Sequence, residues 1–260
     1  MEKDKNLIFF KKVYSSVDKT VKFIFFLNHQ IVEFSYIDKD DGKDIICVPT
    51  QTACNLKCKF CFLSDYDLDV KNLSADQIEF GVSYVVNDLK LCIGAKSLSR
   101  VLLISLMGCG EPLLNLDNII EACSLIRSRY LYSFHIVRFG LSSLIPSLSL
   151  MRKFTGEVGS FGGDLQMKFH FSLHTPIKKK RKELLPSASD IRKSIDLVCE
   201  YVRVTGNSTE IHYALIDGVN DTDEDLFCLI KLLKDKGIPV KFLVYNQKPS
   251  LDLMPSSRVV

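Results

Sequence analysis

Four cysteines lie within one short stretch of the sequence, "CVPTQTACNLKCKFC", which covers residues 47–61. Cys54, Cys58 and Cys61 form a C-x3-C-x2-C run, and Cys47 stands seven positions before it. Thiolates at this spacing suit a compact loop around a soft metal, either zinc or an iron–sulfur cluster. A closed zinc site needs four ligands, usually from two paired motifs, and here there is one run. The run therefore predicts a four-iron cluster with one iron left open for a small ligand, with zinc and core cysteines as the alternatives.

The composition describes an ordinary soluble chain. Its 260 residues are 47% apolar and 25% charged, which suits one large domain with a sizeable core. The net charge of +3 does not by itself indicate a nucleic-acid partner. We find neither a signal-peptide pattern nor an apolar run long enough for a membrane span. We therefore expect a cytoplasmic protein whose clustered cysteines are ligands or catalysts rather than disulfides.

The elements that would position these residues alternate along the chain. The stretch "TVKFIFFLNHQIVEFSYI" has the pattern of a β-hairpin. Ser74 and Gln77 then form a capping box at the start of the first helical pattern. The expected strands are "DIICVPT", "VLLISLM", "HIVRFGLSS", "QMKFHFSL", "TEIHYALI" and "PVKFLVYN", and the helical patterns lie near 74–90, 116–130, 146–154, 188–204 and 221–236, the last ending at Gly237.

Alternating strands and helices of this kind predict an α/β fold with a parallel sheet. Specifically, we expect a partial (β/α)6 TIM-like barrel preceded by a β-hairpin extension, with the chemistry at the carboxyl ends of the strands. The expected divisions are an N-terminal tail over 1–19, the hairpin extension over 20–44, the core barrel over 45–246 and a C-terminal tail over 247–260.

Several motifs carry a family resemblance. "CNLKCKFC", with an aromatic residue before its last cysteine, resembles the cluster loop of radical S-adenosylmethionine (SAM) enzymes, and "LMGCGEPLLN" resembles their glycine–glutamate–proline segment. Together with "KNLSADQI", "FSLHTP", "ALIDGVND" and "VYNQKP", they make residues 20–249 similar to the RlmN/Cfr family of radical SAM RNA methyltransferases.

This resemblance implies cofactors, a reaction and partners. A [4Fe-4S] cluster on Cys54, Cys58 and Cys61 would bind SAM, and one electron would cleave SAM to a 5′-deoxyadenosyl radical. The product would be an adenine methylated at carbon 2 or 8 in rRNA or tRNA. A small donor protein such as flavodoxin or ferredoxin would supply the electron. Two alternatives stay open: hydrogen abstraction from a peptide or small molecule, and a truncated or degenerate methyltransferase without turnover.

The resemblance also assigns SAM contacts. Gly110 and Glu111 match the SAM-binding glycine and glutamate, since glycine allows close approach and a carboxylate suits the SAM amino group. The third strand departs from the family, because the serine expected at Gly140 is absent and Ser142 is the nearest hydroxyl. The remaining matched SAM contacts are Ser172, Leu173, His174 and Asn246.

Cys47 and Glu33 match two further family residues. The cysteine seven residues before the cluster resolves a covalent protein–RNA adduct through a transient disulfide, and the glutamate accepts a proton, which are roles for a nucleophile and a base. Cys47 could instead be a buried strand cysteine. The run "KKKRK", residues 178–182, is either a solvated face or a phosphate contact, and its Arg181 matches a family arginine.

The chain also departs from the family at both ends. The family carries a methyl group on a cysteine in a C-terminal extension, whereas the last cysteine here is Cys228, and the N-terminal RNA-binding domain has no counterpart. We therefore expect the parts for SAM cleavage and adduct resolution without the methyl carrier. A fragment, a partner that supplies the cysteine, or different radical chemistry would each explain this. The remaining cysteines are expected in the core: Cys92, Cys109, Cys123, Cys199 and Cys228.

Overall fold

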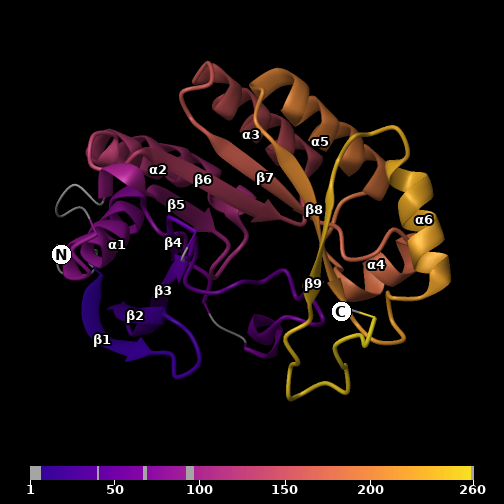
Figure 1. Ribbon diagram of the computed structural model, residues 1–260. Coiled ribbons are helices and arrows are strands. Elements are labelled where there is room, and N and C mark those ends of the chain that lie inside the picture. Colours follow the sequence, from indigo (N-terminus) through magenta and orange to yellow (C-terminus); the bar gives the residue numbers. More distant parts are fainter. Residues whose placement is uncertain (1–6, 40, 67–68, 92–96, 259–260) are drawn as a thin grey trace. The chain divides into compact units, whose positions relative to one another are not determined.

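The computed structural model describes residues 7–39, 41–66, 69–91 and 97–258 (Figure 1). The chain forms two compact units. The first comprises Met1–Ala53, Asp69–Leu141 and Asp164–Met167, and the second comprises Cys54–Leu68, Ser142–Gly163 and Lys168–Val260. The cysteine-rich stretch is therefore divided, because Cys47 belongs to the first unit and the C-x3-C-x2-C run to the second.

The first unit is built on a mixed sheet. The hairpin predicted from sequence is confirmed, and its turn residues Asn28 and His29 have positive φ angles of 48° and 65°, as tight hairpin turns favour. β1 to β4 pair in antiparallel order and β4 to β6 in parallel order. The strands are β1 (Ile8–Tyr14), β2 (Thr20–Leu27), β3 (Gln30–Lys39), β4 (Lys43–Cys47), β5 (Val101–Leu106) and β6 (Ile136–Ser143), whose last two residues belong to the second unit.

β1 lies in the segment that was expected to be a tail. Its pairing with β2 is accompanied by aromatic contacts, since the Phe9 ring stacks on Tyr84 at 4.7 Å and meets Phe25 edge-on at 5.6 Å. These rings bury apolar surface that the sequence pattern of a lysine-rich lead-in did not reveal.

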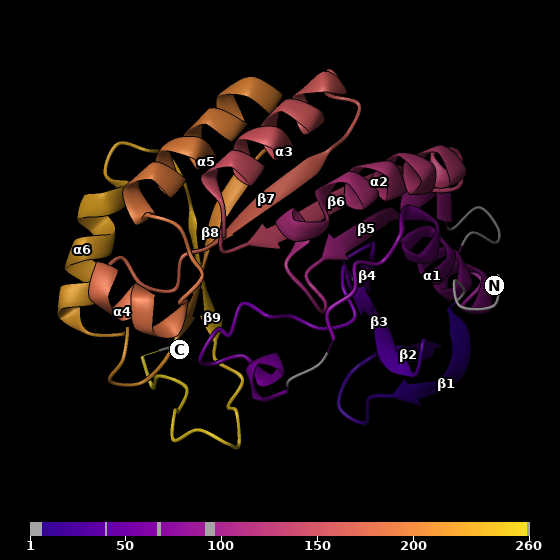
Figure 2. The ribbon, with the colours of Figure 1, turned by 180° about the vertical axis from the view of Figure 1, so that it is seen from behind.

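Two helices complete the first unit. α1 (Ala75–Asp88) begins at the capping box, which is confirmed by both reciprocal bonds between Ser74 and Gln77. α2 (Leu116–Tyr130) follows the short 3-10 helix η3 (Pro112–Asn115), lies beside α1 in Figures 1 and 2, and ends where the sequence predicts. A second 3-10 helix, η2 (Ser97–Ser99), precedes β5.

The second unit has its own parallel strands, β7 (Met167–Ser172, whose first residue belongs to the first unit), β8 (Thr209–Leu215) and β9 (Val240–Val244). The core between these strands and their helices contains the buried rings of Phe154, Phe169 and Tyr201, of which Phe154 and Tyr201 stack at 5.2 Å. The helices are α3 (Leu148–Ser160), α4 (Lys178–Leu184), α5 (Ile191–Thr205) and α6 (Asp223–Leu233), and the cluster run leads into the 3-10 helix η1 (Phe62–Asp65).

The predicted α/β class is confirmed, and each expected strand and helix is present in the described residues. Three details differ. α4 was not predicted, and α3 continues to Ser160 rather than ending near residue 154. α6 ends at Leu233 rather than near residue 236, because Asp235 at φ 63° turns the chain before Gly237. Within the described residues, no helix is both long enough and apolar enough to cross a membrane.

Candidate active site

The C-x3-C-x2-C run forms a tight loop in the second unit. All three cysteines are half-buried. The Cys61 N–H donates to the Cys58 carbonyl at 3.0 Å, and the Ser64 hydroxyl donates to the Cys61 carbonyl at 2.7 Å. Lys57 has a positive φ of 52°, so the backbone curls back between the first and second cysteines. The three thiols therefore come from one short segment that forms a closed turn.

Contacts on both sides fix this loop to the rest of the second unit. The Lys59 N–H donates to the Leu184 carbonyl at the end of α4 at 2.9 Å. At the other end, the buried Lys248 ammonium donates to Ser64 at 2.7 Å and pairs with Asp65 at 2.5 Å. The anchoring lysine comes from the segment that was expected to be a C-terminal tail.

The aromatic residue of the motif also has a definite place. The Phe60 ring meets the His174 ring edge-on, with centroids 4.9 Å apart, and meets Tyr245 at 6.4 Å. Two segments with predicted roles are therefore adjacent within this unit, the cluster loop and the carboxyl end of β7.

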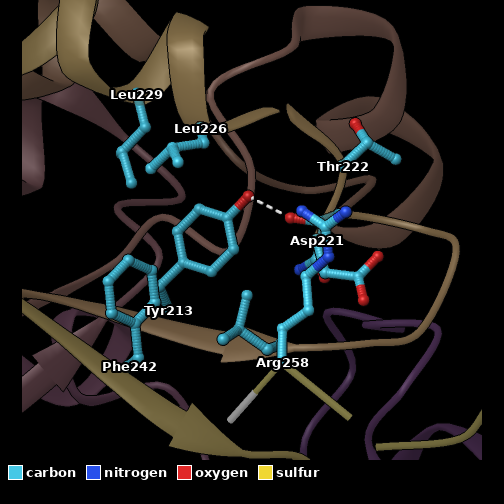
Figure 3. A pocket seen from close by; sticks show the side chains of 9 residues that line it. Tyr213, Asp221, Thr222, Leu226, Leu229, Phe242 and Arg258 are labelled. Atoms are coloured by element: carbon cyan, nitrogen blue, oxygen red, sulfur yellow. Dashed lines mark hydrogen bonds between the residues drawn. The ribbon is translucent and has the colours of Figure 1, made fainter. Parts of the chain in front are cut away.

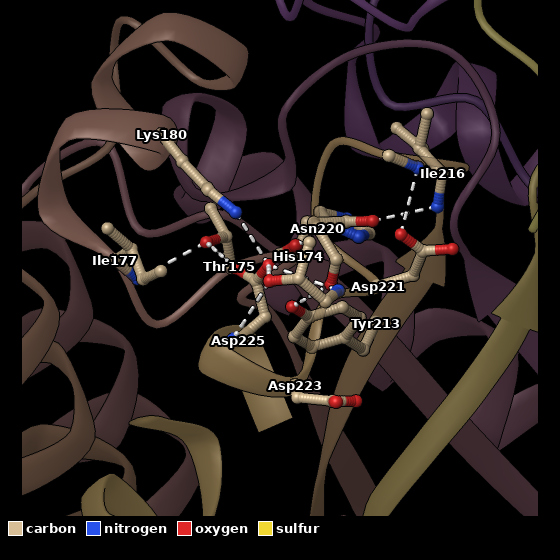
Figure 4. A network of polar contacts seen from close by, with 12 residues as sticks. His174, Thr175, Ile177, Lys180, Tyr213, Ile216, Asn220, Asp221, Asp223 and Asp225 are labelled. Atoms are coloured by element: carbon tan, nitrogen blue, oxygen red, sulfur yellow. Dashed lines mark hydrogen bonds and ion pairs between the residues drawn. The ribbon is translucent and has the colours of Figure 1, made fainter. Parts of the chain in front are cut away.

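His174 is held in a strained position by hydrogen bonds to its ring and its backbone (Figure 4). Its φ is 54°, its Nδ1 accepts from the Ala214 N–H at 3.0 Å, and its carbonyl accepts from the Asn220 amide at 2.6 Å. Burial, together with the smaller effects of the charges of Arg181 and His212, lowers the pKa of His174 to about 3. The ring is therefore neutral, and because Nδ1 accepts, Nε2 carries the proton and can donate.

Asn220 is a positioning residue that was not predicted, although it lies within the matched "ALIDGVND". Its amide donates to the carbonyls of His174 and Ala214, and its Oδ1 accepts from the Ile216 N–H at 2.7 Å. Nearby, Asp225 accepts from Thr175 and pairs with Lys180 at 2.6 Å, which ties α6 to α4 (Figure 4).

Arg181 has a different role from the one its sequence suggested. It is 3% exposed and donates from its Nη atoms to the backbone carbonyls of Leu144, Ser172 and Leu173. For this arginine the phosphate-contact interpretation is wrong, because the side chain fastens strand ends together. The neighbouring exposed lysines of α4 are Lys178, Lys179 and Lys182.

The surroundings of the loop suit an anionic cluster. Burial lowers the pKa of Arg181 to about 10 and nearby Cys58 opposes this, so a buried cation stands close to a cluster thiol. Arg181 Nε is buried without a hydrogen-bond partner among the described atoms.

The other predicted SAM contacts in the second unit differ in their exposure and hydrogen bonding. The hydroxyls of Ser142 and Ser172 are 3.0 Å apart and bonded to each other, so the structure brings these two together. Leu173 has a fully buried side chain, and its carbonyl is occupied by Arg181, so it shapes the backbone only. Asn246 is exposed and lies two residues beyond β9.

Gly110 and Glu111 lie in the first unit, directly before η3. Gly110 has φ +101°, and a Cβ there would meet the Gln51 Cβ at 2.7 Å and the Thr50 hydroxyl at 2.8 Å. Only glycine fits this position. Glu111 is buried, its N–H donates to the Gln51 side chain at 2.8 Å, and its carboxylate accepts from the Leu113 N–H at 3.1 Å.

Cys47 and Glu33 also lie in the first unit. Cys47 ends β4, opposite Ser35 on β3 and Ser105 on β5. The Ser35 hydroxyl donates to Glu33 at 3.1 Å, and Lys22 pairs with the same carboxylate at 3.0 Å. Burial raises the pKa of the Cys47 thiol, Ser105 lowers it by hydrogen bonding, and the Glu33 charge raises it. The two predicted residues are therefore electrostatically coupled.

A cavity outside these residues lies beside α6 (Figure 3). Its volume is about 380 Å³, and its apolar lining includes Leu226, Leu229 and Phe242. Tyr213 donates to the Asn220 carbonyl at its edge, and Arg258 pairs with Asp223 at 2.7 Å. None of the predicted site residues lines this cavity. Among the remaining cysteines, Cys123 is buried, Cys109, Cys199 and Cys228 are half-buried, and Cys92 lies outside the described residues.

Known proteins resemble the chain in sequence and in fold. No family model matches the sequence. The probable dual-specificity RNA methyltransferase RlmN of Bacteroides fragilis is 30% identical over 241 residues, which are 92% of this chain and 64% of that protein. The RlmN of Clostridium novyi, also 30% identical, matches 91% of this chain and 65% of its own length. The chain thus spans just under two thirds of the length of these relatives.

A solved structure shares the fold of this chain. A radical SAM methyltransferase from Sphaerobacter thermophilus superposes with a TM-score of 0.81 at 24% identity, over 96% of this chain and 70% of that one. This likeness confirms the predicted fold class. The sequence resemblance is confirmed as well: over about nine-tenths of its length, the chain is similar to probable dual-specificity RNA methyltransferases named RlmN.

Proposed function

We propose that the protein is a radical SAM enzyme that methylates carbon 2 or carbon 8 of an adenine in rRNA or tRNA. The observation that carries this proposal is the three-cysteine loop, which is fixed to β7 through Phe60 and His174 and lies beside buried Arg181. Homology to RNA methyltransferases supplies the reaction class. Both cofactors, a [4Fe-4S] cluster and SAM, belong to the proposal.

Each part of the chain has a defined task in this reaction. A reduced cluster, when bound, supplies the electron that cleaves SAM. Cys54, Cys58 and Cys61 would hold it, and Arg181 would balance the thiolate charge. In the second unit, the neutral His174 ring offers its Nε2–H as a donor, and Ser142 and Ser172 offer hydroxyls.

In the first unit, Glu111 would accept hydrogen bonds from an amino group, as expected for a SAM contact. Its position is set by the Gln51 bond and by the close approach that Gly110 allows. Asn246 is exposed and carries its proposed SAM contact on family similarity alone.

Cys47 and Glu33 would resolve a covalent adduct between protein and RNA. In this step Glu33 would accept a proton and the Cys47 thiolate would attack the sulfur of a second cysteine that carries the RNA adduct. A disulfide would form as the bond between that sulfur and the methylene carbon breaks, and the carbon, leaving with the electron pair, would take up a proton to become the methyl group of the released RNA. The coupling of the two residues through the sheet supports this pairing. The exposed lysines of α4 would contribute phosphate contacts that add affinity without sequence information. A small electron-donor protein would reduce the cluster.

Mass spectrometry of RNA tests the proposal directly. Cells with the gene should contain 2-methyladenosine or 8-methyladenosine in rRNA or tRNA that cells without the gene lack. The Cys58→Ala variant should fail to restore the modification. If the modification is unchanged while the purified protein still forms 5′-deoxyadenosine, the alternative of hydrogen abstraction from a peptide or small molecule is correct instead.

A further inference from the structure

Three potential metal ligands meet on β7 and β8, away from the cysteine loop. His170 lies opposite Glu210 in the strand register, and His212 follows two residues later on the same face of β8. The ligand atoms of these three residues all lie within 4.8 Å of one another. Within the described part of the chain, this is the one group of three such side chains that gathers so closely.

The hydrogen bonds within the group resemble the arrangement around a metal ion. His170 Nδ1 and His212 Nε2 both face the same carboxylate oxygen, Glu210 Oε1, at 2.9 and 3.0 Å. The second oxygen, Oε2, is bound by the Lys168 ammonium. Oε1 therefore faces both histidines while Lys168 holds Oε2, as outer-shell groups orient metal ligands.

Two histidines and one carboxylate are a ligand set that divalent transition metals prefer. Zinc accepts nitrogen and carboxylate ligands at about 2.0–2.2 Å, and two histidines with one glutamate leave a further position open. Both histidines are 9% exposed, so the strands already hold the rings in place. Small ring rotations would bring the atoms to bonding distance, with each imidazole proton on the remote ring nitrogen, so binding needs no net loss of protons.

We propose that His170, Glu210 and His212 form a binding site for a divalent transition-metal ion of the zinc type. The proposal does not depend on the cluster or on RNA methylation. A bound ion would link β7 to β8, because its ligands come from both strands. It would add to the hydrogen bonds that the His212 carbonyl accepts from the N–H groups of Leu173 and His174. Lys168, and Lys241 opposite His212, place positive charge nearby and limit the affinity.

Zinc binding to the 260-residue chain tests the proposal, with Cys54, Cys58 and Cys61 occupied by the reconstituted cluster. Calorimetry should show one equivalent of zinc bound, and the bound zinc should raise the thermal unfolding temperature by mass action. X-ray absorption at the zinc edge should show only nitrogen and oxygen neighbours. Glu210→Gln and His212→Ala should each weaken binding at least about tenfold, whereas exposed His135→Ala, the matched control, should bind as the wild type does.

Each other outcome overturns the site. A sulfur neighbour at the zinc edge would assign the ion to the cysteines, and an absence of binding at micromolar zinc would leave a hydrogen-bonded cluster only. Equal affinity for Glu210→Gln and His135→Ala would show that the carboxylate is not a ligand. If His212→Ala does not fold, the near-isosteric Glu210→Gln still decides the question.

Discussion

The cysteines of the opening stretch occupy two contrasting environments. Cys47 sits on a strand, where its neighbours are fixed by register and burial makes its thiol less acidic. Cys58 sits on a loop of the second unit, where its charge interacts with the buried guanidinium of Arg181. Seven residues of sequence therefore separate a thiol on a strand from the first of three thiols that share one loop. Proximity in sequence says less about thiol chemistry than the element that carries each thiol.

The largest expected difference between the two environments is in iron binding. Cys58→Ala should reduce the iron bound after reconstitution at least about tenfold and abolish the spectrum of the cluster, because a cluster held by three protein thiolates loses one of its ligands. Cys47→Ala, the matched control, should retain the iron of the wild type. Iron analysis and electron paramagnetic resonance check both. Equal iron loss in the two variants would remove the distinction between them.

Arg181 should be the next most sensitive position. Arg181→Met leaves the carbonyls of Leu144, Ser172 and Leu173 buried without donors, and we expect unfolding to become easier by about 3 kcal/mol. Arg181→Lys keeps the charge without the planar fork and should recover only part of this loss. Urea denaturation of both variants measures it. A change below about 1 kcal/mol for Arg181→Met would show that these bonds contribute little.

The Cys47 thiol should react slowly at neutral pH. Since burial raises its pKa above the ordinary value, the thiolate fraction should rise about tenfold per pH unit through the range where the thiol is still protonated. Alkylation by iodoacetamide, followed by mass spectrometry of the peptide containing Cys47, gives the rate at each pH. A rate that is already constant above pH 7 would contradict the raised pKa.

The smallest expected effect concerns Glu33. Because its negative charge raises the pKa of Cys47, Glu33→Gln should speed alkylation of Cys47 by about two- to threefold at a given pH. Lys22, which pairs with Glu33 at the surface, keeps the effect modest. Ser35→Ala is the matched control for loss of a neighbouring polar group. A slower reaction in Glu33→Gln would mean that the carboxylate assists deprotonation directly.

Much of the fold was predictable because its signals are local. The capping box at Ser74 and the hairpin around Asn28 each depend on residues a few positions apart. β1 and α4 escaped prediction because tertiary contacts stabilise them, through the ring of Phe9 in one case and the buried guanidinium of Arg181 in the other. Their lysine-rich sequences show no matching apolar period.

The site divides in the same way. Cys54, Cys58 and Cys61 were predictable because one loop holds their spacing. His170 and Glu210 are forty residues apart, and only the pairing of β7 with β8 brings them together. The burial of Arg181 could not be predicted from the sequence either, because a charged run on a short helix usually faces solvent.

SAM cleavage by the reconstituted protein tests the central claim most directly. Under anaerobic conditions, with SAM and a strong reductant, the wild type and Cys47→Ala should both form 5′-deoxyadenosine, and Cys58→Ala should form none above background. Chromatography with mass detection quantifies the product. Absence of 5′-deoxyadenosine from a wild type that carries its full iron complement would contradict the account, and so would equal product from Cys58→Ala.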